Sequence, residues 1–245
     1  MSTAEGGGNI VTDGLVLLLD AANTKSYVSG STIWNDLTII NNVGTLINGA
    51  SFNTLNNGSI EFDGTNQWCR LIDYPEYRNN TNMSLSVWFN FSSLPIDTLS
   101  LINKGPQDAS LNRNYFWLHY TNGATPATKN LWWEGGGGSG STDLFQLRYN
   151  WVPNINTWYN VTSTFEPNLV KIYLNGELVI SSATTVSIVA ANLVSSSYPF
   201  AIGTYRNSLF YNFPGKINLP MFYRKTLSQQ EVLQNYNTTR ARFGI

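Results

Sequence analysis

Residues 160–179, NVTSTFEPNLVKIYLNGELV, decide the fold of this chain. Val170, Ile172 and Leu174 occupy every second position, which places them on one face of a β-strand. The pair Asn175-Gly176 follows at once, and it is the strongest short hairpin signal because both central residues of a type I′ turn need positive φ. We predict that this stretch is a framework hairpin.

The same alternation recurs along most of the chain. Leu85, Val87, Phe89 and Phe91 share one face of another predicted strand. Further strands are expected at residues 15–20, 59–63, 99–103, 115–120, 130–133, 144–149, 200–204 and 216–223. Many short strands with regularly spaced turn signals predict an all-β fold, a two-sheet antiparallel β-sandwich of jelly-roll type.

One short helix is expected at the C-terminus. Ser228 and Glu231 form a capping box, and an apolar stripe of Val232, Leu233 and Tyr236 follows it. The Gly-rich residues 1–10 are expected to form a flexible arm, and residues 11–245 a single domain.

Charge is sparse, at 12% of residues with a net charge of −1. Without a basic field, the chain is not expected to bind nucleic acid. Its longest early apolar run, Leu15 to Leu19, is too short to span a membrane. A surface rich in Asn, Ser and Thr predicts a homo-oligomer or a subunit that docks on a lattice.

Residues for catalysis are scarce, so we expect that the protein is not an enzyme. The single histidine, His119, excludes metal sites built from several histidines, and no Gly-x-Ser-x-Gly nucleophile motif is present. The single cysteine, Cys69, excludes a disulfide within the chain, and we expect it to be buried.

Glu61 and Asp63 are the one acidic pair that merits a catalytic hypothesis. Residues two apart on a strand point to the same side, and glycosidases use two carboxylates. The third acid of the usual jelly-roll pattern is absent, because Thr65 occupies its position. Alternatively, Asp63 starts a turn and Glu61 faces solvent. A calcium site is also conceivable, with oxygen ligands from Asp63 and Asn66.

Exposed aromatic residues are the candidate ligand-binding groups, because such rings stack on sugars or anchor protein contacts. Trp132 and Trp133 are neighbours on a predicted strand and face opposite sides, so one of them should be exposed beside the Gly-rich residues 134–141. A second candidate patch consists of Tyr205, Arg206, Phe210 and Tyr211.

Several segments resemble a known family. They are residues 14–23 (GLVLLLDAAN), 34–37 (WNDL), 44–50 (GTLINGA), 60–66 (IEFDGTN), 86–89 (SVWF), 174–176 (LNG), 222–232 (FYRKTLSQQEV), 235–237 (NYN) and 242–244 (RFG). Together they resemble the concanavalin A-like, laminin G-type jelly-roll domains of phage virion proteins, cyanophages especially, over almost the whole chain.

The resemblance implies a non-catalytic virion structural protein, expected on the particle surface and made in the host cytoplasm. Because the domain makes up nearly the whole chain, a head decoration or accessory surface protein is the first expectation, with other virion proteins as partners and weak glycan affinity. The alternatives are a lectin-like tail adhesin that binds host polysaccharide and, third, a glycoside hydrolase that uses Glu61 and Asp63. No cofactor is expected apart from the calcium considered above.

Overall fold

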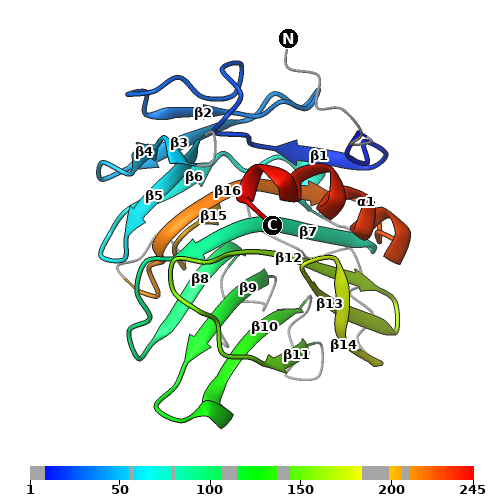
Figure 1. Ribbon diagram of the computed structural model, residues 1–245. Coiled ribbons are helices and arrows are strands. Elements are labelled where there is room, and N and C mark those ends of the chain that lie inside the picture. The colour runs from blue at the N-terminus through cyan, green and yellow to red at the C-terminus, as the bar shows by residue number, and fades with distance from the viewer. Residues whose placement is uncertain are drawn as a thin grey trace.

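The computed structural model describes residues 9–55, 58–78, 81–105, 115–136, 144–183, 199–205 and 210–245. Within these residues the chain folds into two antiparallel sheets packed face to face, with one α-helix near the C-terminus (Figure 1). The expected all-β sandwich with a short C-terminal helix is therefore confirmed. In the described part of the chain, no helix is long and apolar enough to cross a membrane.

The first sheet has eight strands among the described residues. They are β1 (Leu15–Leu18), β4 (Ser51–Asn53), β5 (Ser59–Asp63), β7 (Met83–Phe91), β12 (Trp158–Glu166), β13 (Leu169–Leu174), β14 (Glu177–Ala183) and β16 (Pro214–Tyr223). The strand order is β14-β13-β12-β7-β16-β5-β4, and β1 pairs with β16 off this path. β7 lies at the centre and pairs with β12 and β16, far from it in sequence.

The second sheet also has eight strands among the described residues. They are β2 (Ile33–Asn35), β3 (Val43–Ile47), β6 (Trp68–Leu71), β8 (Thr98–Lys104), β9 (Tyr115–Asn122), β10 (Lys129–Gly136), β11 (Leu144–Asn150) and β15 (Phe200–Ile202). The strand order is β11-β10-β9-β8-β15-β6-β3-β2. Three 3-10 helices complete the described elements: Pro75–Tyr77, Pro126–Thr128 and Arg240–Phe243.

The main core lies between the two sheets and is built from the alternate positions that the sequence marks as apolar. Leu85, Val87, Phe89 and Phe91 of β7 enter it together, as predicted. Across from them, Phe116 and Leu118 of β9 and Leu131 and Trp133 of β10 enter it from the second sheet. The intervening residues of each strand therefore point away from the core, and they form the two outer faces of the sandwich.

Helix α1 (Gln229–Thr239) packs against the outer face of the first sheet (Figure 1). It begins at the predicted capping box, in which Ser228 Oγ accepts a hydrogen bond from the Glu231 amide. Trp88 of β7 stacks on Tyr236 and Phe243, and its indole N–H donates to Thr239 Oγ1. The helix therefore covers an aromatic face that a two-layer sandwich would leave in water.

The hairpin at residues 160–179 forms as expected, and both turn residues have positive φ, 51° at Asn175 and 83° at Gly176. At the other end of the chain, Gln234 Nε2 donates to the carbonyl of Asn9, and the Val11 amide donates to Asn235 Oδ1. The chain from residue 9 onward thus contacts α1. Residues 1–8 of the expected arm lie outside the described residues.

Candidate functional site

The outer face of the second sheet carries a column of aromatic side chains. Trp117 and His119 of β9 point away from the core, because they alternate with Phe116 and Leu118, which point into it. β10 pairs with β9 so that Trp132 lies directly opposite His119, and β11 places Arg148 opposite Trp132. Cross-strand partners on one face come into contact, so these four side chains meet across three strands.

The column is stacked ring on ring. The ring centroids of Trp132 and His119 are 5.4 Å apart with an interplanar angle of 20°, and those of His119 and Trp117 are 3.8 Å apart at 21°. Trp117 then lies 4.3 Å from Tyr205 and 5.6 Å from Tyr211. We call this set, Trp132, His119, Trp117, Tyr205 and Tyr211, the aromatic ladder.

Each end of the aromatic ladder has a different chemistry. At the Trp132 end, the guanidinium of Arg148 lies 4.1 Å from the centroid of the Trp132 ring, which is a cation–π contact. The Arg148 side chain is exposed. At the other end, Phe210 is 67% exposed and lies 6.4 Å from the Tyr211 ring. One end of the aromatic ladder thus carries a positive charge, and the other end carries an exposed apolar ring.

Local hydrogen bonds fix the middle of the aromatic ladder. The Trp117 indole N–H donates to Ser100 Oγ over 2.9 Å, and this hydroxyl donates to the carbonyl of Thr204 over 2.8 Å. Tyr205 and Phe210 pair through an isolated β-bridge, and Tyr211 has a positive φ of 59°. Tyr205 and Tyr211 are therefore held beside Trp117 at the outer face of the sheet.

Buried polar groups accompany the rings. His119 is only 4% exposed, and its Nε2 lies 3.7 Å from Oε1 of Glu134, a buried carboxylate that also accepts a hydrogen bond from Gln146 Nε2. Burial lowers the pKa of His119, and the Glu134 carboxylate opposes this shift without reversing it. Among the described residues, neither ring nitrogen of His119 nor the indole nitrogen of Trp132 has a hydrogen-bond partner.

The two sequence-predicted patches therefore belong to one surface. Trp132 is partly exposed, as expected for one of the tryptophan pair, and it joins Tyr205, Phe210 and Tyr211 through His119 and Trp117. The prediction that Trp133 binds a ligand is wrong. Its side chain has no exposed surface and lies in the main core, where its indole N–H donates to the Thr164 carbonyl.

Sequence reasoning missed the linking residues. His119 and Trp117 alternate with core residues, a signal that was present, but only the strand register shows that they lie beside Trp132. Arg148 and Glu134 carried no sequence signal. Arg206 of the second predicted patch and residues 137–141 of the Gly-rich stretch lie outside the described residues.

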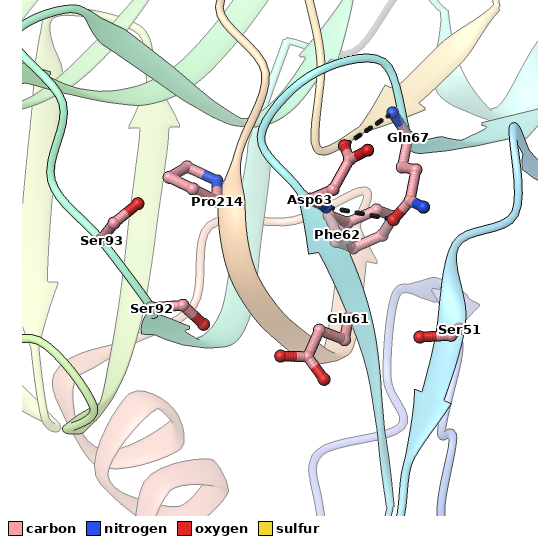
Figure 2. Close-up of a pocket in the computed structure, with 8 residues that line it drawn as sticks. All are labelled: Ser51, Glu61, Phe62, Asp63, Gln67, Ser92, Ser93 and Pro214. Carbon is pink, nitrogen blue, oxygen red and sulfur yellow. Dashed lines mark hydrogen bonds between the residues drawn. The ribbon is translucent and has the colours of Figure 1, made fainter.

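A separate pocket of about 360 Å³ surrounds the acidic pair of β5 (Figure 2). It is lined by Ser51, Glu61, Phe62, Asp63, Gln67, Ser92, Ser93 and Pro214. Glu61 accepts a hydrogen bond from Asn53 Nδ2 over 2.8 Å, and its Oε1 lies 3.5 Å from Nζ of Lys216. The pair that suggested a glycosidase thus lies in a pocket, with one carboxylate beside a lysine.

Asp63 holds a turn together. Its Oδ1 accepts the backbone amides of Thr65, Asn66 and Gln67 over 2.8 Å, 3.2 Å and 3.4 Å, while its own amide donates to Gln67 Oε1. Asp63 therefore starts a turn, the alternative reading of the sequence.

The surroundings of Asp63 do not fit a calcium ion. Calcium takes six to eight oxygen ligands, whereas the turn already uses Asp63 Oδ1. No cluster of three potential acidic, histidine or cysteine ligands exists in the described ranges. The backbone carbonyl of Asn66 is engaged as well, because it accepts a hydrogen bond from Asn48 Nδ2.

Solved structures similar to this one include carbohydrate-related proteins. A botulinum neurotoxin DC binding domain in complex with SialylT superposes with a TM-score of 0.67 at 14% identity, covering 93% of this chain and 52% of that one. Domain 4 of a GH43 extracellular arabinanase from Geobacillus stearothermophilus, in complex with arabinotriose, gives 0.54 at 16% identity, covering 91% and 87%.

A Trypanosoma rangeli sialidase superposes with a TM-score of 0.66 at 16% identity, covering 98% of this chain and 35% of that one. Identities this low establish a shared fold. This chain also spans only about half the length of the botulinum neurotoxin binding-domain chains that it matches.

No curated protein matches this sequence. A family model described as the concanavalin A-like lectin/glucanases superfamily matches residues 63–233, which is well over half of the chain and includes the whole aromatic ladder but not Glu61 of the acidic pocket. The chain therefore belongs to the concanavalin A-like lectin/glucanases superfamily.

Proposed function

We propose that this protein is a non-catalytic carbohydrate-binding domain that binds its ligand along the aromatic ladder. The observation that supports this proposal most strongly is the stack of side chains from Arg148 to Tyr205. The stack continues through Tyr211 to the exposed ring of Phe210. Sugars present both apolar C–H faces and hydroxyl groups, and a ligand surface that fits them combines aromatic rings with a few fixed polar groups.

The aromatic ladder provides both kinds of contact. Most ring faces within the stack cover one another, and the most exposed apolar ring beside the stack is that of Phe210, next to Tyr211. Arg148 and Gln146 are exposed at the opposite end and can donate hydrogen bonds to hydroxyl oxygens. We therefore expect an oligosaccharide to lie across the strands, from β11 toward Tyr211.

The state of the acidic pair supports the absence of catalysis. A glycosidase needs one carboxylic acid to donate a proton and a second carboxylate free to act as base or nucleophile. In this pocket Oδ1 of Asp63 accepts hydrogen bonds from three backbone amides. Glu61 accepts one from Asn53 Nδ2 and lies 3.5 Å from Nζ of Lys216, so both carboxylates are already engaged within the protein.

A binding screen tests the proposal. The wild-type protein and the Phe210→Ala and Arg148→Ala variants would be applied to immobilised neutral and sialylated oligosaccharides. Both residues are exposed, so the variants should fold, and we expect each to weaken saccharide binding by about tenfold, the size of a stacking or charge-assisted contact. Ile39→Ala is the matched control, because Ile39 is an exposed apolar residue away from the aromatic ladder.

The result that would contradict the proposal is clear. If the Phe210→Ala and Arg148→Ala variants, one at each end of the aromatic ladder, both bind saccharides as tightly as the wild type and the control, the aromatic ladder is not the binding surface. Hydrolysis of any bound oligosaccharide, abolished by Glu61→Gln, would contradict the non-catalytic part.

We also propose a setting for this domain, the surface of a phage particle, as a head decoration or a tail adhesin. The sequence resemblance to phage virion domains and the sparse charge of the chain support it. Quantitative mass spectrometry of purified particles from the source would give the copy number relative to the shell protein. Scores to hundreds of copies would support decoration and three to twelve a tail adhesin, whereas absence from particles would overturn the virion proposal.

A further inference from the structure

The pocket around Glu61 is not explained by the aromatic ladder, because it belongs to the other sheet. Glu61 and Asp63 lie on the outer face of β5, since Ile60 and Phe62 point into the main core. Ser51 of β4, Pro214 of β16 and the serines that follow β7 complete the wall (Figure 2). Its volume, about 360 Å³, is within the range of small-molecule sites.

Three hydroxyl groups in this pocket are free to bind a ligand. Ser51, Ser92 and Ser93 are exposed, and their hydroxyls make no hydrogen bond within the part of the chain that the structure describes. The backbone at Ser92 is nevertheless fixed, because its amide donates to the Pro214 carbonyl over 2.9 Å. Each hydroxyl can donate one hydrogen bond and accept others, so the wall offers both functions from an ordered frame.

The carboxylates add acceptors. Asp63 uses Oδ1 for its turn, while its Oδ2 has no partner among the described residues. Glu61 accepts a hydrogen bond from Asn53 at Oε2, and Oε1 lies 3.5 Å from Lys216 Nζ, beyond ordinary hydrogen-bond length. The side chain of Gln67 is occupied, since Oε1 accepts the Asp63 amide and Nε2 donates to the Gly49 carbonyl.

These charges and hydrogen bonds select a class of ligand. An anion would face two carboxylates. A divalent cation would find one of them beside Lys216 and the other committed through Oδ1 to backbone amides. A neutral molecule with several hydroxyl groups can donate to Oδ2 of Asp63, which has no partner among the described residues, and exchange hydrogen bonds with the serines.

We infer that this pocket is a second saccharide-binding site, specific for a neutral sugar. It shares its ligand class with the proposed function but uses none of the residues of the aromatic ladder. Because the two sites lie on the outer faces of different sheets of the sandwich, one molecule can hold two sugar units at once, one on each face.

Nuclear magnetic resonance titration tests this site directly. The probe is a panel of neutral oligosaccharides built from pentoses, hexoses and N-acetylhexosamines, with arabinotriose among them, each added to the full chain. We expect the backbone amide signals of Ser51, Gln67 and Ser92 to shift with at least one sugar. Ser93→Trp fills the pocket and should raise the Kd for these shifts at least tenfold. Ser181→Trp, on an exposed position of β14 in the same sheet, should not.

The outcomes separate the two sites. Shifts at the pocket that survive Phe210→Ala and disappear in Ser93→Trp support the inference, whatever happens at the aromatic ladder. No shift at the pocket with any sugar of the panel overturns it. Titration with calcium chloride alone is the third arm, and amide shifts there with calcium but not with sugars would mean a cation site and overturn it too.

Discussion

His119 is the single histidine of the chain, and its ring is stacked between those of Trp117 and Trp132. The side chain is buried, and among the described residues both ring nitrogens lack a hydrogen-bond partner. A buried polar group in this state usually has a functional or structural reason. In this protein the neutral imidazole is the flat middle member of the aromatic ladder, a position that an imidazolium would hold only at a desolvation cost.

This burial predicts how stability depends on pH. The pKa of His119 is lowered in the folded state, whereas in the unfolded chain it should be near 6.5. Below that pH the unfolded chain takes up a proton that the folded chain does not. The free energy of unfolding should therefore fall by up to about 1.4 kcal/mol per pH unit until the folded-state pKa is reached.

Urea unfolding of the wild type and of His119→Phe, between pH 7.5 and pH 5, measures this contribution. The phenylalanine preserves a stacked ring and cannot titrate, so the stability of the wild type relative to the variant should decrease as the pH falls. A difference that stays constant over this range would mean that His119 does not titrate differently in the folded and unfolded states.

At the scale of elements, the hairpin of residues 160–179 and helix α1 support each other. Gln229 Nε2 donates to the Gly176 carbonyl over 2.9 Å. A Cβ at Gly176 would lie 2.9 Å from Cδ1 of Tyr236, so the turn lies directly against the helix. Gly30 has nearly the same φ, 86° against 83°, but a Cβ there would meet nothing within 4 Å.

A comparison of alanine substitutions at Gly30 and Gly176 separates the free-energy cost of backbone strain from the cost of the clash with Tyr236. Gly30→Ala should cost only the left-handed backbone strain, about 1–2 kcal/mol. Gly176→Ala should cost a further 1–3 kcal/mol, roughly, because Tyr236 and the helix must shift to accommodate the methyl group. Urea unfolding at neutral pH measures both variants. Equal losses of stability would show that the turn and α1 do not press on each other.

Elements with strong local patterns could be predicted from the sequence, and those that depend on distant partners could not. Alternation identified β5, β7 and β13, and the capping box placed the start of α1 at Ser228. The three-residue strands β2 and β4 were not among the expected strands, because they are too short for alternation to show. β3 was missed too. The run at Trp68 and Cys69 is strand-like in the sequence, but its pairing as β6 with β3 and with Phe200–Ile202, far along the chain, could not be predicted.

At the scale of the whole molecule, the sandwich presents two different outer faces. The outer face of the first sheet is covered by α1 over Trp88. The same face holds the acidic pocket near the sheet edge that β5 and β4 form. The outer face of the second sheet carries the aromatic ladder. The sequence predicted Trp132, Tyr205 and Tyr211 as members of two separate patches, without Trp117 and His119. Their union could not be predicted, because it depends on the register of β9 against β10 and on Tyr205 folding onto Trp117.

The chain carries its own reporters for the central claim, because each of its eight tryptophans has one indole N–H. Trp117 and Trp132 belong to the aromatic ladder, whereas Trp34, Trp88 and Trp133 are fully buried elsewhere. The most direct test is a nuclear magnetic resonance titration of these signals, assigned by single Trp→Phe variants, with the oligosaccharides of the binding screen. We predict that the Trp117 and Trp132 signals shift with saturation while those of Trp34 and Trp88 stay in place. Saccharide binding that leaves both ladder signals unmoved, or the absence of binding to any oligosaccharide, would contradict the account.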